Sequence, residues 1–265
     1  MADINTDSPI ISLTTDFGLS DNYVGVIKGI ITGLNSNAKL IDNSHDVPKY
    51  NINVGSYSIE TAYKYYPCGT IHLVVVDPGV GTKRKAILIE IEDFYFIGPD
   101  NGIFSFLEKK AIKKIISLKN KKYFLKEIST SFHARDIFAP VAGFLSLGVS
   151  PDEFGPEINT IERSKSNRIR KTKRGFWGNI IYIDSFGNIV TSFRLNNLPS
   201  DSCNIYLGSI KIGRLRKTFG SVKAETPVAY INSSGYLEIA INGGSAADYF
   251  SVDYKSKEKI LIATS

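Results

Sequence analysis

The stretch Ile71-His72-Leu73-Val74-Val75-Val76-Asp77-Pro78-Gly79-Val80-Gly81-Thr82-Lys83-Arg84 decides the fold class. Its apolar first part, residues 71–76, predicts a buried strand that ends abruptly at a carboxylate, a proline and glycines. In an α/β sheet, ligands bind beyond the carboxyl ends of the strands. A charged residue at that point needs a partner, and Arg84 can supply one across a short loop. Asp77 and Arg84 are therefore candidates for a functional site, and a structural ion pair that pins the turn is the alternative.

Strand-like and helix-like segments alternate around this stretch, over residues 1–162. The patterns predict strands at 9–14, 39–42, 71–76, 86–91 and 94–97, and helices at 21–34, 53–66, 101–109 and 136–147. Asp21 is placed to cap the first helix, and Pro140 fits the first turn of the last one. Such alternation predicts an α/β domain with a mainly parallel sheet.

The pattern changes at a basic segment, residues 163–175, where Arg and Lys crowd together with Ser and Asn between them. We interpret this segment as a solvated linker. Beyond it, residues 176–265 contain short β-rich segments separated by Gly, Asn and Ser turns, with one helical piece at 245–250. This pattern predicts an all-β C-terminal domain, a small barrel or a sandwich.

Composition narrows the class of protein. The chain has 265 residues, 43% hydrophobic and 22% charged, as expected of a soluble globular protein. No apolar run approaches the roughly 18 residues of a membrane span, and the acidic, polar start does not resemble a secretory signal. We therefore expect a cytoplasmic protein without membrane contact. Cys68 and Cys203 lie far apart, and the three histidines lack metal-ligand spacing, so no metal site is expected.

The net charge of +6 and the pI of about 9.1 raise nucleic acid as a partner. The excess is concentrated in residues 163–174, however, and no aromatics interleave there to stack on bases. Nucleic acid is thus an unlikely partner, although a non-catalytic nucleic-acid-binding module stays open as an alternative. Residues 79–83 have neither P-loop nor GxGxxG spacing, and no GxSxG elbow of a serine hydrolase is present.

Polar residues recur where predicted strands end, in both halves of the chain. Each such motif, taken singly, is typical of an ordinary turn or helix cap. The motifs are Thr15-Asp16-Phe17-Gly18 with Asp21, Asp77-Pro78-Gly79-Val80-Gly81 with Arg84, Gly98-Pro99-Asp100-Asn101-Gly102, Phe132-His133-Ala134-Arg135-Asp136-Ile137-Phe138-Ala139-Pro140, Asp184-Ser185-Phe186-Gly187-Asn188 and Asn232-Ser233-Ser234-Gly235.

Taken together and in this order, the motifs resemble the S-adenosyl-L-methionine hydroxide adenosyltransferase family, which is related to fluorinating and chlorinating enzymes that attack the same substrate. The resemblance extends from about Ile10 to the C-terminus. It implies that water displaces methionine from S-adenosylmethionine, giving adenosine and L-methionine without a cofactor. It also implies an α/β domain joined to a β-barrel. Finally, it implies a homotrimer in which each active site lies between the N-terminal domain of one subunit and the C-terminal domain of the next.

The resemblance also assigns roles to residues of this chain. Asp77, Arg84 and His133 match the set thought to bind and activate the water, with His133 a possible acceptor of its proton. Asp16 matches the carboxylate that holds both ribose hydroxyls, a role suited to a group that accepts two hydrogen bonds. The remaining matches are Asp21, Asp184 and Ser233 around the methionine end, Asn188 on the adenine with Phe186 beside it, and the backbones of Asn242 and Gly243 on the base.

Two departures from the halogenating relatives are informative. Those enzymes have a different group at the place of Asp77, and the fluorinating one has a halide-binding Ser where this chain has Ala134. An anionic carboxylate would repel a halide, so the sequence favours water over halide and leaves a halogenase as the alternative. The fluorinating enzyme also has an Arg where this chain has Ser234, so the methionine carboxylate is expected to be held differently here.

Overall fold

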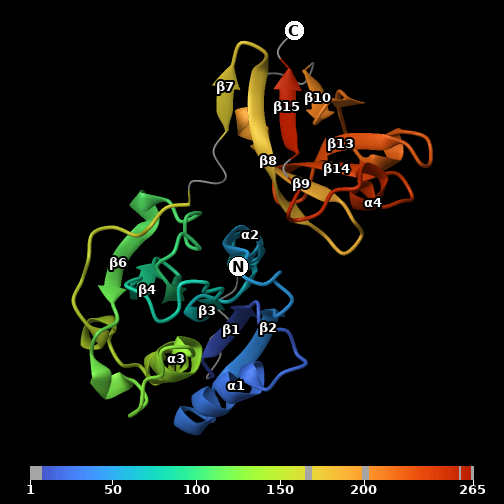
Figure 1. Cartoon of the computed structure of the whole chain (residues 1–265). Coiled ribbons are helices and arrows are strands. Elements are labelled where there is room, and N and C mark those ends of the chain that lie inside the picture. Colours follow the sequence, from blue (N-terminus) through green and yellow to red (C-terminus); the bar gives the residue numbers. More distant parts are fainter. Residues whose placement is uncertain (1–7, 165–168, 199–202, 257, 264–265) are drawn as a thin grey trace. The chain divides into compact units, whose positions relative to one another are not determined.

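A computed structural model of the chain describes residues 8–164, 169–198, 203–256 and 258–263. It contains two compact units, Met1–Ser164 and Lys165–Ser265, coloured blue to green and yellow to red in Figure 1. The first unit contains β1 (Ile10–Thr15), α1 (Tyr23–Leu34), β2 (Lys39–Ser44), α2 (Ile52–Ala62), β3 (Thr70–Val75), β4 (Ala86–Ile91), β5 (Phe94–Pro99), β6 (Ile112–Ser117) and α3 (Ala139–Ser146).

The first unit is built on a six-stranded sheet with the order β2-β1-β3-β5-β4-β6. Strands β2, β1, β3 and β5 run parallel, and β4 pairs antiparallel with both β5 and β6. The sheet is thus mostly parallel, as the alternation of elements predicted. Because β1 and β3 are neighbours that run in the same direction, their carboxyl ends meet at one edge of the sheet.

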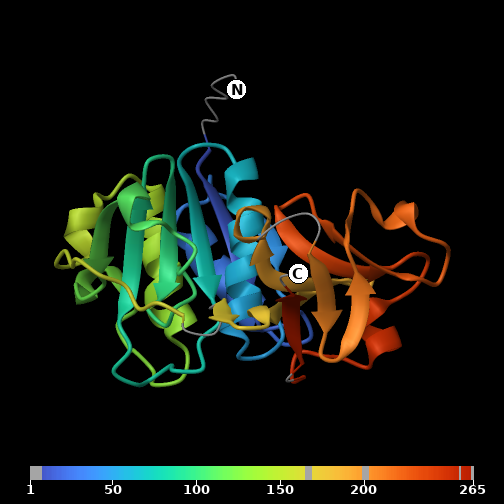
Figure 2. The same ribbon diagram turned by 90° about the horizontal axis from the view of Figure 1, so that it is seen from above.

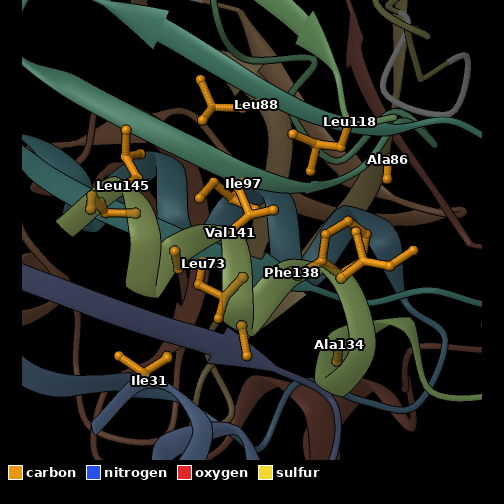
Figure 3. Close-up of a cluster of buried hydrophobic side chains, with 14 of the residues drawn as sticks. Ile31, Leu73, Ala86, Leu88, Ile97, Leu118, Ala134, Phe138, Val141 and Leu145 are labelled. Atoms are coloured by element: carbon orange, nitrogen blue, oxygen red, sulfur yellow. The ribbon is translucent and has the colours of Figure 1, made fainter. Parts of the chain in front are cut away.

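Helices cover both faces of this sheet, and the alternation of side chains along the strands explains how. Odd-numbered residues of β1 and β3, such as Leu13 and Leu73, pack in one hydrophobic cluster with residues of α1 and α3. Figure 3 shows part of this cluster, with side chains labelled at Ile31, Leu73, Leu88, Ile97, Val141 and Leu145. On the other face, His72 stacks on Phe96 and contacts Tyr63, which directly follows α2.

Several elements of the first unit differ from the expectation. Residues 101–107 form turns and bends instead of a helix, and a short 3-10 helix begins only at Lys109. Gly102 has a φ of 97° that a continuing helix does not tolerate. Strand β6 was not predicted, because Lys113 and Lys114 obscure its apolar half. The residue at the N-cap of α1 is Asn22, without a side-chain cap bond, so the expected capping role of Asp21 is wrong.

The second unit contains β7 (Arg170–Thr172), β8 (Gly175–Ile183), β9 (Ile189–Arg194), β10 (Asn204–Leu207), β11 (Ile210–Gly213), β12 (Leu215–Arg216), β13 (Pro227–Ile231), β14 (Tyr236–Ile241), α4 (Ala246–Phe250) and β15 (Lys259–Ala263). The strands form one nine-stranded sheet in the order β11-β10-β15-β8-β9-β14-β13-β12, with β7 paired to β8. β11 also lies against β13, near the other end of this order, so the sheet curls into a nearly closed, barrel-like form. Figure 2 shows its yellow to red strands from above.

The basic segment 163–175 contains more regular structure than a solvated linker. Residues 170–172 form β7, which pairs antiparallel with β8 across a turn. Arg163 is tied to the first unit, since its Nη1 donates to the carbonyls of Ser105 and Leu107 at 2.9 and 2.6 Å. Residues 165–168 of the expected linker lie outside the described residues. A helix long and apolar enough to cross a membrane is absent from the part of the chain that the structure describes.

Candidate active site

Asp77, Arg84 and His133 meet just beyond the carboxyl end of β3. The Nε of Arg84 donates to both carboxylate oxygens of Asp77 at 3.0 Å, and its Nη2 bonds the same carboxylate. The two side chains are 9% and 7% exposed, so this ion pair is almost shielded from water. Nη2 of Arg84 also lies 2.9 Å from Nδ1 of His133. The guanidinium lies over the ring of Phe138, 5.3 Å from its centroid.

This contact determines the proton arrangement on His133. A guanidinium only donates hydrogen bonds, so Nδ1 of His133 must accept, and the neutral ring carries its proton on Nε2. Burial and the positive charge of Arg84 lower the pKa of His133 below its usual value, which keeps the ring neutral. In this tautomer His133 has no free acceptor, and a hydrogen bond with the backbone of Ser129 opposes the lowering of its pKa. The expected role of His133 as the proton acceptor does not fit this arrangement.

The loop that carries Asp77 is held from two sides. The side-chain amide of Asn101 donates to the carbonyl of Val76 at 2.8 Å, directly before Asp77. On the other side, Gly81 has a φ of 76°, and a Cβ there would lie 2.3 Å from the carbonyl oxygen of Thr130. The turn at 98–102, which the sequence marked only as a turn, thus supports the site through Asn101.

His133 is positioned by an unusual helical turn. Residues Ala134–Phe138 form a π-helical turn, closed by the Ala139 N–H on the Ala134 carbonyl, which leads into α3. Pro140 cannot donate to the carbonyl of Asp136 and would clash with it in a regular α-helix. That carbonyl instead accepts from the Leu125 N–H at 2.9 Å. The widened turn therefore has an identifiable cause, and such turns are frequent at functional sites.

Asp16 lies next to this cluster, after the last residue of β1. Thr15 of β1 pairs with Val75 of β3, so Asp16 and Asp77 follow neighbouring strand ends. The carboxylate of Asp16 accepts the N–H of Tyr50 at 2.8 Å. Burial raises the pKa of Asp16, and the negative charge of Asp77 adds to this rise, whereas the Tyr50 N–H opposes it. The structure thus brings Asp16 near Asp77, while Asp21 lies exposed in the turn before α1.

Tyr50 is a residue that the sequence reasoning missed. Its backbone has a φ of 66°, which is unusual for a residue other than glycine, and its side chain is 69% exposed. Strained backbone of this kind tends to cluster at functional sites. No sequence motif marks it; Pro48 only indicates a turn nearby.

In the second unit, Asp184 and Asn188 form one compact turn between β8 and β9. One oxygen of Asp184 accepts the N–H groups of Phe186 and Asn188 at 2.9 and 2.8 Å. The other accepts the side-chain amide of Asn188 at 2.9 Å. Because a carboxylate only accepts, Asp184 fixes which way the amide of Asn188 points. Phe186 at the tip of this turn is 78% exposed.

Ser233 lies at the other end of the same strands. β9 and β14 run antiparallel, with Arg194 opposite Tyr236 and Ile189 opposite Ile239. The 184–188 turn precedes Ile189 and the 232–235 turn precedes Tyr236, so the two turns lie at opposite ends of the ladder. Asp184 therefore lies beside Asn188 and away from Ser233, with which the family resemblance groups it around the methionine end.

The expected base contacts near Asn242 are only partly available. The N–H of Asn242 donates to Thr226 and its carbonyl accepts from Glu225, at 3.2 and 2.7 Å. Its side-chain amide donates to the carbonyl of Val222 at 2.8 Å. Gly243 is exposed, with a φ of 81° and open space where a Cβ would lie. Gly243 is thus better placed than Asn242 to offer backbone to a ligand.

Chemically, the first unit offers a buried carboxylate fixed by a guanidinium, a neutral imidazole that accepts from the same guanidinium, and a second carboxylate nearby. Asp77 retains acceptor capacity, because a carboxylate has about four lone-pair sites and Arg84 does not use them all. The described residues contain no group of three or more His, Cys, Asp or Glu that could hold a metal ion.

The chain is similar to known proteins over most of its length. The family described as SAM hydroxide adenosyltransferase matches with its N-terminal domain over residues 11–155 and with its C-terminal domain over residues 178–259. A protein of Salinispora tropica named (R)-S-adenosyl-L-methionine hydrolase is 34% identical, over 92% of this chain and 95% of its own. One of Methanocaldococcus jannaschii with the same name is also 34% identical, over 95% of both chains.

More distant relatives and a solved structure complete the comparison. A protein of Actinopolyspora mzabensis named fluorinase is 23% identical over 90% of this chain and 92% of its own. The crystal structure of an uncharacterized conserved protein from Thermotoga maritima superposes with a TM-score of 0.84 at 33% identity, covering 96% of this chain and all of the other. With both parts of the chain matched, the protein belongs to the SAM hydroxide adenosyltransferase family.

Proposed function

We propose that this protein hydrolyses S-adenosyl-L-methionine to adenosine and L-methionine. The relatives named as hydrolases of this compound, at 34% identity over nearly the whole chain, support the reaction. The observation that carries the proposal is the shielded Asp77–Arg84 pair with His133, beside Asp16, at the edge where β1 and β3 end.

In the proposed reaction, the oxygen of water attacks C5′ as the C5′–S bond breaks. The bonding electron pair stays on sulfur, so the sulfonium leaves as the neutral thioether of methionine. Since this leaving group is already good, the protein mainly has to hold a weak nucleophile in line, about 3–3.5 Å from C5′. Asp16 would hold the ribose hydroxyls and so set the position of C5′.

Asp77 is the group that we assign as acceptor of the water proton. Arg84 fixes its carboxylate and leaves lone pairs free, whereas His133 has its only acceptor engaged by Arg84. His133 would hold the guanidinium of Arg84 in place against Asp77 through Nδ1. A positioned acceptor of this kind typically contributes roughly 10²–10⁴-fold to the rate.

The second unit would bind the rest of the substrate. We propose that Asn188, oriented by Asp184, reads the adenine with Phe186 and the backbone of Gly243 beside it. Ser233, at the far end of the β9–β14 ladder, and Asp21 would bind the methionine end. We further propose the homotrimer that the family resemblance implies, in which the N-terminal part of one subunit and the C-terminal part of the next complete each site.

A halogenase is the alternative that the same comparisons raise, because fluorinases are among the relatives. The anionic Asp77 supports water over halide, since a charge shielded from solvent repels an anion strongly. The greater identity to the hydrolases points the same way.

The test is incubation of the purified protein with S-adenosylmethionine in ¹⁸O-water, with and without chloride. We expect adenosine labelled at its 5′ oxygen, methionine in equal amount and no dependence on chloride. A chlorinated nucleoside would make the protein a halogenase, and intact substrate would refute the hydrolase proposal. Asp77→Ala is the matched inactive control.

A further inference from the structure

The turn that carries Asp16 is clamped by the loop after β2. We define this clamp as residues 45–50 acting on residues 15–18. The N–H of Gly18 donates to the carbonyl of His45 at 2.8 Å, and the N–H of Tyr50 donates to Asp16 at 2.8 Å. The imidazole Nδ1 of His45 lies 2.8 Å from the hydroxyl of Thr15. Both ends of the loop therefore hold the turn.

His45 is itself fixed by a chain of charged groups. Its Nε2 lies 3.0 Å from Asp42, and Asp42 accepts from the ammonium of Lys28 at 2.7 Å. Burial alone would raise the pKa of Asp42, but the bonds from Lys28 and His45 outweigh it and hold the pKa below its usual value. Asp42 is thus an anion that can only accept, so Nε2 of His45 donates to it, and Nδ1 is the nitrogen that shares a hydrogen bond with the hydroxyl of Thr15.

The hydrogen-bonded series Thr15–His45–Asp42 resembles the hydroxyl–imidazole–carboxylate arrangement of nucleophilic enzymes. Thr15, however, is only 1% exposed, and His45 is 5% exposed, so a substrate cannot reach the hydroxyl. Its oxygen also accepts the N–H of Phe17 at 3.3 Å. The arrangement is therefore suited to hold the turn and not to react.

We propose that His45, through Thr15 and the Gly18 N–H, is the positioning residue that orients Asp16 toward both ribose hydroxyls. The inference rests on the proposed role of Asp16 in substrate binding. A carboxylate that must accept from two neighbouring hydroxyls has to be held within about 0.5 Å, which a free turn does not provide. His45 restrains the backbone before Asp16 through the hydroxyl of Thr15, and the backbone after it through the N–H of Gly18. The N–H of Tyr50 occupies one acceptor site of the Asp16 carboxylate.

The chain offers a matched pair of variants. Thr15→Val removes the hydroxyl that bonds His45. Ser12→Ala, on the same strand, removes a hydroxyl that lies 2.6 Å from Nδ1 of another buried histidine, His72, away from the turn. Thr15→Ser keeps the hydroxyl and serves as the rescue.

The first readout is the ratio of dissociation constants for 2′-deoxyadenosine and adenosine, measured by calorimetry. A hydrogen bond to a charged group gives the wild type a preference of roughly 10- to 100-fold for adenosine. We expect Thr15→Val to reduce this preference to within a few-fold, and Ser12→Ala and Thr15→Ser to keep it. The second readout, amide hydrogen exchange at Gly18 and Phe17 in the free protein, should speed up only in Thr15→Val.

The outcomes separate this inference from the proposed function. An unchanged preference in Thr15→Val, with or without faster exchange, would overturn the positioning role. Hydrolysis without any ribose preference in the wild type would also overturn it, while the proposed function stood. A preference that falls only in Thr15→Val, in a protein that leaves S-adenosylmethionine intact, would support the positioning role and refute the hydrolase.

Discussion

Replacing Arg84 by Met tests whether the Asp77–Arg84 pair is a shielded unit. The Met side chain keeps apolar contact with Phe138 but leaves Asp77 without its counter-charge. Both side chains are less than 10% exposed, at 9% and 7%, so the remaining carboxylate stays largely out of water. Breaking a buried pair by removing one partner costs about 3–5 kcal/mol of the free energy of unfolding.

A double-mutant cycle measures the coupling energy between Asp77 and Arg84. In Asp77→Asn/Arg84→Met no charge remains, so we expect part of the lost stability to return, with a coupling energy of about 0.5–3 kcal/mol between the two sites. The assay is urea unfolding at pH 7, with unchanged m-values as the check on two-state behaviour. Lys114→Met, which breaks the solvent-exposed pair with Asp152, is the control and should leave the unfolding midpoint unchanged. Additive effects of the two single variants, or a loss below about 1 kcal/mol in Arg84→Met, would refute the reasoning.

Three further perturbations test other parts of the structure. Asp77→Asn should lower kcat/KM for adenosine formation by roughly 10²–10⁴-fold, because an amide cannot take the water proton; wild-type turnover would exclude that role. Burial lowers the pKa of His72 in the folded protein to about 3. Below about pH 6.5 the His72 side chain is therefore protonated in the unfolded chain but stays neutral in the folded protein. Stability attributable to His72 should therefore fall as the pH drops, by about 2 kcal/mol at pH 5 relative to pH 7, and His72→Gln should flatten this dependence in urea titrations. Gly81→Ala should impair both activity and stability, because its φ is 76° and the new Cβ would meet the Thr130 carbonyl at 2.3 Å. Gly25→Ala in α1, which meets nothing within 4 Å, should be neutral or stabilising in the same thermal melts.

The candidate site depends on local features that break regular structure. The π-helical turn follows from Pro140, and the tight approach of the 77–84 loop to Thr130 requires glycine at position 81. Neither feature alone identifies a site, but together they place His133, Arg84 and Asp77 in hydrogen-bonding contact. Irregular backbone thus holds the three groups of the candidate site together.

Much of the first unit could be predicted from the sequence. The apolar run at 71–76 and its abrupt end at Asp77 predicted a buried strand, and β3 covers Thr70–Val75. Periodicity with small-residue turns was sufficient there, because buried parallel strands and amphipathic helices have strong patterns. β6 is not predicted because lysines interrupt its apolar residues. The apolar spacing of 101–109 suggests a helix, but the φ of 97° at Gly102 interrupts it.

The sequence by itself determined the fold class, the family and the identity of the polar residues at the strand ends, since these follow from residue types and their order along the chain. Only the tertiary structure decided the state and partners of those residues. Which nitrogen of His133 is protonated depends on Arg84, 49 positions away in sequence, and the support of Asp16 comes from His45 and Tyr50 on another loop. The physical reason is that hydrogen bonds and burial depend on distances in space, which the parallel sheet sets by placing the ends of β1 and β3 side by side.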